Sequence, residues 1–218
     1  MKDGLKPTPR QYVAFQAAFD YFNGELFAGT LPHVVLTFSR ASRTLGFFVN
    51  GIWFGKNTDG NKEMRCEIAL NPDYIGQRYY KDTMATLVHE MCHLWQEVDG
   101  TAPRRCYHNK DFSKKMESVG LITSNTGKEG GKRTGQNMTQ YIQAGGRFEK
   151  AYEKMPDACK IPYITIASLE GPAKKKIKRN KSNRVKYVCP VCGAAVWGKE
   201  GLHMICGDCM EAMEPIEK

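Results

Sequence analysis

The sequence predicts an α+β fold, with helices packed on a small antiparallel sheet and a small four-cysteine ribbon near the C-terminal end. Residues 81–99 carry apolar side chains at helical spacing, which is typical of a helix packed on a core. Three short apolar segments before this helix end at turn-forming residues, as strands do. Two C-x-x-C turns close to the C-terminus indicate a separate small unit. We therefore expect one sizeable core and a small appendage within the 218 residues.

The elements follow from caps, turns and periodicity, taken in chain order. The first helix begins near Pro9, because proline is favoured in a first turn, and Gly29 can end it. The second strand contains Asn50-Gly51, a dipeptide typical of hairpin turns. The predicted elements are a helix at 8–27, strands at 34–39, 45–54 and 65–70, a helix at 81–99, a short helix at 111–119 that Gly120 can end, helix within 139–155 interrupted at Gly145-Gly146, and a strand at 161–169.

The helix at 81–99 contains His89-Glu90-Met91-Cys92-His93, an H-E-x-x-H motif. At about 100° per residue, the apolar stripe spans roughly 60° to either side of Met91, whereas His89 and His93 lie about 160° away in either direction. The two imidazoles therefore form a pair almost opposite the stripe. Two imidazoles one turn apart, with a carboxylate between them, are the minimum arrangement for holding zinc and activating water. The motif predicts metal-assisted hydrolysis, with Glu90 as the general base.

A catalytic zinc site needs a third protein ligand. His108 is the best candidate, because it lies between the loop at 100–107 and a short helix, so that the chain can turn back beneath the first pair. Cys106 is a rival ligand two residues earlier. His33 lies in a proline-led apolar segment, and His203 lies between the C-terminal cysteine pairs.

The chain has eight cysteines and no secretion signal, which argues for reduced thiols or metal ligands rather than disulfides. Four of them form two C-x-x-C turns with thirteen residues between the pairs. Each turn aims two thiolates at one point, and two turns complete a tetrahedral zinc site. The predicted ligands are Cys189, Cys192, Cys206 and Cys209. We therefore expect two zinc ions per chain, one catalytic and one structural.

The net charge of +9 is concentrated in residues 171–188, which contain eight Lys and Arg residues and no acid. This segment is too charged to fold by itself, so we expect a basic linker between a domain at 1–170 and the ribbon at 189–218. Such a linker attracts phosphate backbones by counterion release, although a nuclear-localisation signal has the same composition. In the ribbon, Trp197 either stacks on an unpaired base or packs over the ribbon's small core. The candidate nucleic-acid-binding residues are Lys174, Lys175, Lys176, Lys178, Arg179, Lys181, Arg184, Lys186 and Trp197.

The chain has no run of about 18 apolar residues, and its first residues lack the apolar segment of a secretion signal. We expect a cytoplasmic protein, associated with the nucleoid if the host is bacterial. We also expect DNA and DNA-bound proteins as partners, no membrane partner, and a monomer rather than an oligomer.

The H-E-x-x-H motif, the residues Trp95, Gly100, His108 and Phe112, the basic stretch and the ribbon together resemble the SprT family of metalloproteases. The eukaryotic relative of this family is Spartan, a protease that degrades proteins crosslinked to DNA. The similarity covers roughly residues 10–120 and the ribbon.

The resemblance implies that His89, His93 and His108 are zinc ligands and that Glu90 is the general base. It also implies a zincin-like core, more narrowly a gluzincin-like one, and cleavage stimulated by DNA. We therefore expect a zinc-dependent endopeptidase that acts on DNA-associated or DNA-crosslinked proteins. Zinc proteases commonly bind an extended peptide beside an edge strand, and we expect 65–70 to be that strand because it directly precedes the motif helix.

Two other functions remain open from the sequence. The first is a non-proteolytic DNA-binding regulator or recruitment factor with a structural or vestigial metal site. The basic segment and the ribbon fit this alternative equally well, but a purely structural zinc does not need Glu90. The second is zinc-dependent hydrolysis of a non-peptide substrate, for which no nucleotide or sugar motif is present.

Overall fold

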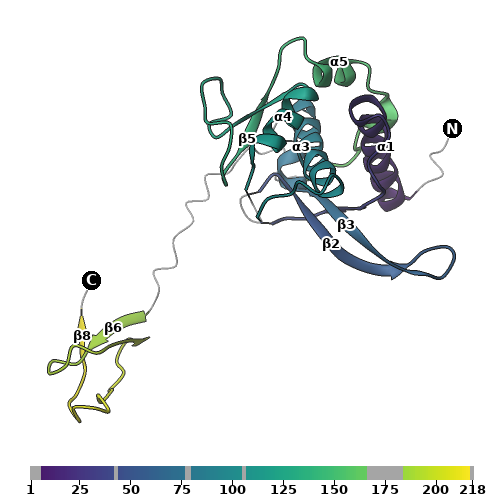
Figure 1. Cartoon of the computed structure of the whole chain (residues 1–218). Coiled ribbons are helices and arrows are strands. Elements are labelled where there is room, and N and C mark those ends of the chain that lie inside the picture. Colours follow the sequence, from purple (N-terminus) through teal and green to yellow (C-terminus); the bar gives the residue numbers. More distant parts are fainter. Residues whose placement is uncertain (1–5, 42–43, 77–79, 105–106, 166–183, 217–218) are drawn as a thin grey trace. The chain divides into compact units, whose positions relative to one another are not determined.

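The structure, a computed structural model, describes residues 6–41, 44–76, 80–104, 107–165 and 184–216. The chain divides into two compact units, residues 1–172 and residues 173–218 (Figure 1). The first unit holds the H-E-x-x-H motif and the second holds the paired cysteines.

Helix α1 (Pro7–Phe27) begins with a proline in its first turn and ends at Ala28, which takes left-handed backbone angles. Phe15, Phe19 and Phe22 recur along one face of this helix and are fully buried. The predicted first helix is therefore confirmed, and its aromatic face forms one wall of the core.

The sheet of the first unit has three strands, β1 (Val35–Phe38), β2 (Gly46–Lys56) and β3 (Lys62–Leu70), in the order β1-β3-β2. Strand β2 pairs antiparallel with β3, but β1 pairs parallel with it. The sheet is therefore mixed, and the prediction of an antiparallel sheet was wrong. Strand β2 pairs with one edge of β3 in the hairpin, and the chain direction of β1 is opposite to that of β2. When β1 pairs with the remaining edge of β3, it must therefore run parallel to it.

The hairpin turn predicted at Asn50-Gly51 does not form, because β2 continues through these residues. The Asn50 side chain instead donates a hydrogen bond to Glu97 on the motif helix. The chain reverses a few residues later, where Asn57 Oδ1 accepts hydrogen bonds from the backbone amides of Asp59 and Asn61, at 3.0 and 2.9 Å. The turn therefore forms where the Asn57 side chain accepts hydrogen bonds from the backbone amides of the turn.

The strand that was expected at 65–70 lies within β3, in the middle of the sheet. Residues 67–70 are paired on both edges, with β1 and with β2, and the Ile68 and Leu70 side chains are buried. The prediction that this strand is an edge was therefore wrong. In the described sheet, β2 is the edge strand beside the motif helix.

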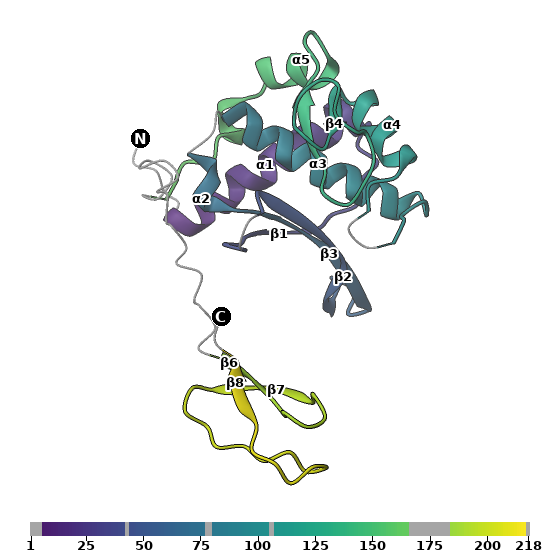
Figure 2. The ribbon, with the colours of Figure 1, turned by 90° about the vertical axis from the view of Figure 1, so that its left-hand side faces the viewer.

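A short helix, α2 (Pro72–Ile75), leads to the motif helix, α3 (Tyr80–Val98). The helices α1, α3, α4 and α5 lie on one side of the three-stranded sheet (Figure 2). Gly46 on β2 allows the close approach of α3, because a Cβ at this position would lie 2.8 Å from the Ala69 carbonyl oxygen and 3.1 Å from Thr86 Cγ2. The side chains of α3 that are fully buried in the core are Met84, Leu87, Val88, Met91, Cys92 and Leu94.

After α3 the chain forms α4 (Lys110–Ser118), the paired strands β4 (Leu121–Ser124) and β5 (Thr139–Ile142), α5 (Arg147–Glu153) and a 3-10 turn, η1 (Asp157–Cys159). The helix predicted within 139–155 is thus split, since its first residues form β5. The last strand was predicted at 161–169. Residues 161–165 are not in a strand, and residues 166–169 lie outside the described part of the chain.

The second unit is a three-stranded antiparallel sheet of β6 (Arg184–Val188), β7 (Ala195–Lys199) and β8 (Glu214–Ile216), in the order β7-β6-β8. The Tyr187 side chain is buried, and its hydroxyl donates to the Lys199 carbonyl at 2.7 Å. Leu202 N donates to the same hydroxyl at 3.0 Å. A single buried tyrosine thus ties the loop after β7 to the middle strand.

Candidate metal centre

His89, Glu90 and His93 lie on α3, within the first unit. The side of α3 opposite its apolar stripe is also covered, because His89 and Glu90 are only 6% and 7% exposed. The His89 and Glu90 side chains are therefore largely shielded from bulk water, whereas His93 is half-buried.

His108 reaches this site through a backbone pairing that is distant in sequence. His108 and Gly135 form an isolated β-bridge, with N···O distances of 2.8 and 3.1 Å. The next residue, Asn109, caps α4 by accepting a hydrogen bond from Phe112 N at 2.9 Å. Its side-chain oxygen also accepts from Gln96 Nε2 on α3 at 2.8 Å. The Gln96–Asn109 contact therefore joins the two helices next to His108.

The three histidines converge through their Nε2 atoms. His108 Nε2 lies 3.1 Å from both His89 Nε2 and His93 Nε2. For tetrahedral zinc with Zn–N bonds of about 2.0–2.1 Å, ligand nitrogens lie about 3.3 Å apart. The three nitrogens therefore have the spacing of a metal-ligand set, with one ligand atom from each histidine lying within 4.8 Å of the other two. Cys106, the rival third ligand, lies outside the described residues.

The tautomer of His108 supports the same conclusion. His108 Nδ1 lies 3.1 Å from the Gly135 carbonyl oxygen, which can only accept a hydrogen bond. Nδ1 therefore carries the proton, and Nε2 presents a lone pair to the centre of the site. His89 differs, because its Nδ1 is buried and has no hydrogen-bond partner among the described residues.

Burial controls the ionisation of the three histidines and of Glu90. Desolvation lowers the pKa of His89 to about 3 and that of His93 to about 2, and it also lowers the pKa of His108. The imidazoles are therefore neutral at pH 7, which is their ligating form. Burial has the opposite effect on the acid, and it raises the pKa of Glu90 to about 8.

Phe112 supports all three imidazoles from α4. Its ring stacks on His93 at 4.2 Å between centroids and lies 5.1 Å from His89 and 4.8 Å from His108. Phe48 on β2 also lies nearly parallel to His93, with 6.3 Å between the ring centroids. The sequence indicates Phe112 only through the family resemblance, because nothing in the spacing of the residues shows that its ring packs against the histidines.

The site opens into a cleft of about 960 Å³. Its walls are the three histidines, Glu90, the first half of β2, the loop before His108 and residues 136–138. Tyr107 also lines the cleft. The cleft therefore leaves room for a substrate beside the histidines and against the edge strand.

The second potential metal-binding group is in the ribbon, where the Sγ atoms of Cys189, Cys192, Cys206 and Cys209 lie within 4.8 Å of one another. Sγ of Cys192 and Sγ of Cys206 are 3.7 Å apart, far beyond a disulfide bond. Backbone hydrogen bonds, first from Cys192, lower the pKa of Cys189 to about 7, which favours a thiolate. Four converging sulfur atoms are the usual ligand set of a structural zinc ion.

The two cysteine turns have matching backbones. Gly193 N donates to the Cys189 carbonyl at 3.0 Å, and Met210 N donates to the Cys206 carbonyl at 2.8 Å. Both Gly193 and Met210 have positive φ angles, 72° and 55°. The left-handed residue of the second turn is therefore Met210 and not a glycine.

Most of the candidate nucleic-acid-binding residues, Lys174 to Lys181, lie outside the described residues. Arg184 and Lys186 lie on β6, and Lys186 is directly opposite Trp197 on β7. Trp197 is 57% exposed, whereas Tyr187 occupies the buried position of the ribbon. Trp197 therefore does not form the ribbon's core, and its ring is accessible beside a lysine.

No helix in the described part of the chain is long and apolar enough to cross a membrane. The expected cytoplasmic location is not tested by this observation.

Comparison with known proteins identifies the first unit. A family model for the SprT-like family matches residues 15–132, which is more than half of the chain and includes all three histidines. An uncharacterized protein in the mucB 3′ region of Salmonella typhimurium is 44% identical over 41 residues. This match covers 19% of the present chain and 55% of that protein, so the chain spans about half the length of this relative. The match over residues 15–132 shows that the chain belongs to the SprT-like family.

Proposed function

We propose that this chain is a zinc-dependent endopeptidase that acts on DNA-associated or DNA-crosslinked proteins, with Glu90 as its general base. One observation carries the proposal: three neutral imidazoles converge in a cleft that is also lined by Glu90, a carboxyl group that is only 7% exposed. A purely structural metal site does not need this carboxyl group.

The Nε2 atoms of His89, His93 and His108 would hold the zinc ion. When bound there, zinc polarises a carbonyl group and lowers the pKa of a water ligand to about 7. Glu90 accepts a proton from the attacking water and later donates it to the leaving amine nitrogen. Burial raises the pKa of Glu90 to about 8, and a nearby cation lowers the pKa of such a group, so this carboxyl is placed to both accept and return a proton near neutral pH.

The cleft favours an extended polypeptide as the substrate. Strand β2 lines it and is an edge strand of the described sheet, so its backbone groups are available to pair with a substrate backbone. A motif helix packed beside an edge strand is also what supports the proposal of a zincin-like core. Tyr107 lines the cleft and carries a hydroxyl donor, which is the kind of group that can stabilise an oxyanion.

The proposed delivery to DNA rests on the ribbon and the basic segment. Trp197 and Lys186 lie side by side on an accessible face, which suits base stacking combined with a phosphate contact. These features also fit the alternative of a non-proteolytic DNA-binding regulator. Glu90 favours the endopeptidase, because a regulator with a vestigial site has no use for a general base in a substrate-sized cleft.

The test is Glu90→Gln in the full chain, with a DNA-binding protein crosslinked to an oligonucleotide as the probe. We expect cleavage to fall by at least about a thousandfold because the proton acceptor is lost, while zinc content and DNA affinity stay unchanged. Asp99→Asn, an exposed carboxylate just beyond α3, is the matched control and should cleave normally. Undiminished cleavage by Glu90→Gln would exclude this role. Salt-sensitive DNA binding without cleavage, under every zinc and DNA condition, would favour the regulator.

A further inference from the structure

The β2–β3 hairpin extends beyond the helices (Figure 1). Its outer part carries large apolar side chains that are exposed to solvent. Ile52, Phe54 and Met64 are 58%, 69% and 66% exposed. Neighbouring exposed apolar side chains of this size are typical of a binding surface. We call Ile52, Phe54 and Met64 the apolar arm.

The register of the sheet shows which face the arm occupies. Phe54 is directly opposite Met64, so their side chains lie on the same face. Along β3, alternate residues from Met64 to Ile68 share that face, and Ile68 is buried in the core beneath the helices. The arm therefore continues, into solvent, the face on which the helices pack.

The same face leads directly to the metal centre. Ile68 is opposite Phe48, which lines the cleft and stacks parallel to His93. Ile52 also lines the cleft, so the arm and the cleft share a residue. From Ile68 to Met64 is four residues of β3, which is about 13 Å of extended chain. Strand β2 covers the same length with two extra residues, because its register shifts between Val49 and Trp53, so an extended polypeptide beside it reaches Phe54 about four of its own residues from the level of His93.

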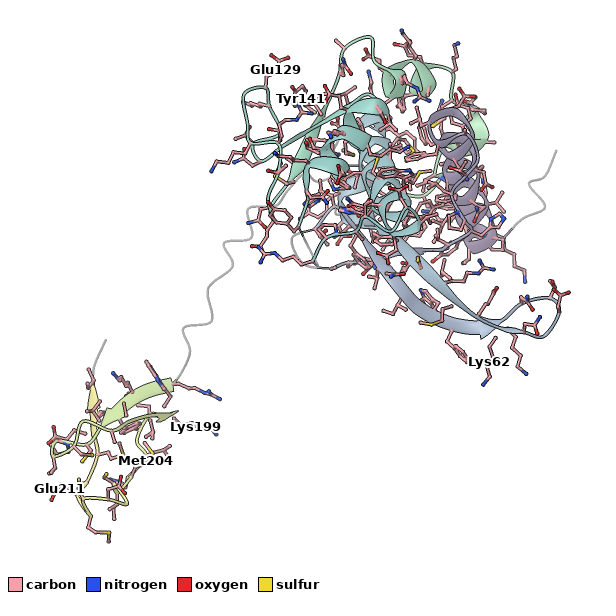
Figure 3. All side chains as sticks on the ribbon, in the orientation of Figure 1. Lys62, Glu129, Tyr141, Lys199, Met204 and Glu211 are labelled. Atoms are coloured by element: carbon pink, nitrogen blue, oxygen red, sulfur yellow. The ribbon has the colours of Figure 1, made fainter. Side chains whose placement is uncertain are left out.

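The charges of the arm favour a polypeptide over a nucleic acid. Lys56 and Lys62 are paired at the end of β2 and β3, and Lys62 lies near the far end of the hairpin (Figure 3). Asp59 lies in the turn between these lysines, and Glu63 forms an ion pair with Arg65. The mixed signs leave little net positive potential for a phosphate backbone, whereas the aliphatic side chains suit apolar substrate residues.

We propose that the apolar arm is a second substrate-binding surface, which takes apolar side chains of an extended polypeptide about four residues from the bond that is cut. The inference rests on the proposed peptidase function, because it places the substrate along β2. It predicts a preference for unfolded protein segments, since folded proteins bury the apolar residues that the arm would contact.

The test compares a long and a short substrate with the full-length, zinc-loaded protein. Phe54→Ser with Met64→Ser should lower kcat/KM at least about tenfold on β-casein, a disordered polypeptide, because two large apolar contacts are lost. A hexapeptide cut at its centre extends only about 10 Å to either side, so its kcat/KM should change less than about twofold. Phe54→Leu with Met64→Leu should restore casein cleavage, and Val13→Ser, an exposed apolar residue on α1, is the matched control. Far-UV circular dichroism verifies the fold of each variant.

The outcomes separate this inference from the proposed function. Suppose that the wild type cuts casein. If the serine variant then has the same kcat/KM on casein, or loses kcat/KM equally on casein and on the hexapeptide, the arm has no such role. If the wild type cuts neither substrate, the peptidase proposal fails. Fluorescence anisotropy with labelled casein then tests the arm by itself. Weaker casein binding by the serine variant supports the arm as a binding surface, and unchanged casein binding overturns it. Weaker binding of a single-stranded oligonucleotide with unchanged casein binding would make the arm a nucleic-acid surface and overturn the inference.

Discussion

At the scale of single residues, the metal centre depends on contacts that orient its ligands. Gly135 sets the tautomer of His108 through its carbonyl oxygen, and Phe112 packs against all three imidazoles. The ligand types were predictable, because the H-E-x-x-H spacing is local. The packing of Phe112 was not, since it depends on how α4 returns to α3.

Asn109 gives a prediction at this scale. Asn109→Ala removes the cap of α4 and the acceptor for Gln96, so we expect a loss of about 1 kcal/mol in unfolding free energy and weaker metal binding at the histidines. Urea denaturation and competition with a zinc-binding dye measure the two effects. Asn109→Asp keeps both acceptor roles and loses only the long hydrogen bond that Asn109 Nδ2 donates to the Thr101 carbonyl at 3.4 Å, so it should preserve most of the stability and metal affinity. Equal metal affinity in the alanine variant would show that the cap does not position His108.

At the scale of elements, caps and periodicity predicted helices well and strand partners poorly. Helices α1 and α3 carry their signals within their own residues, so the sequence located both. The hairpin turn predicted at Asn50-Gly51 was wrong, because the bulged strand continues and Asn57 satisfies the backbone of a later turn. Strand pairing is decided between distant segments, which local patterns do not encode.

A side chain added at Gly120, which packs against the start of α5, should strongly lower the stability of the protein. Its φ angle is 88°, and a Cβ there would lie 2.7 Å from Arg147 N and 2.8 Å from Phe148 N. Gly120→Ala should therefore lower the unfolding free energy by at least about 2 kcal/mol, from backbone strain together with a clash against backbone. Gly60→Ala has a similar φ angle of 80° and nothing within 4 Å, so it should cost about 1 kcal/mol from strain alone. Equal losses in denaturant melts would contradict the clash.

The contacts of Glu149 predict that the thermal stability of the protein depends on pH. Its side chain forms an ion pair with Lys81 on α3 and accepts a hydrogen bond from Gly145 N, and these contacts lower its pKa below 4.5. A carboxyl group with a lowered folded pKa stabilises the protein above its unfolded pKa, and this stability is lost as pH falls through the folded pKa. Glu149→Gln should therefore lower the Tm at pH 7, and the difference from the wild type should disappear as the pH falls through the lowered pKa of Glu149. Glu153→Gln, an exposed acid on the same helix, is the control, and a Tm difference that persists in acid would argue against the ion pair.

At the scale of the whole molecule, the two ligand sets lie in different compact units, residues 1–172 and 173–218. We therefore expect the metal sites to fill independently. Purified protein should contain two zinc ions per chain by mass spectrometry of the metal, and His108→Ala should lower this to one. Cys189→Ser with Cys192→Ser should also leave one zinc, at the histidines. A zinc content that stays unchanged in His108→Ala would refute the histidine assignment.

The sequence by itself determined the chemistry of both ligand sets, because a helical turn and a C-x-x-C turn bring donor atoms together over four or five residues. Tertiary structure decided what surrounds them. The His108–Gly135 bridge closes the histidine site, and the order β1-β3-β2 makes β2, not β3, the edge strand that lines the cleft. Both arrangements depend on backbone hydrogen bonds between segments far apart in the chain. Every residue offers the same backbone donor and acceptor, so the pairing is chosen by the packing of the whole unit and not by local sequence.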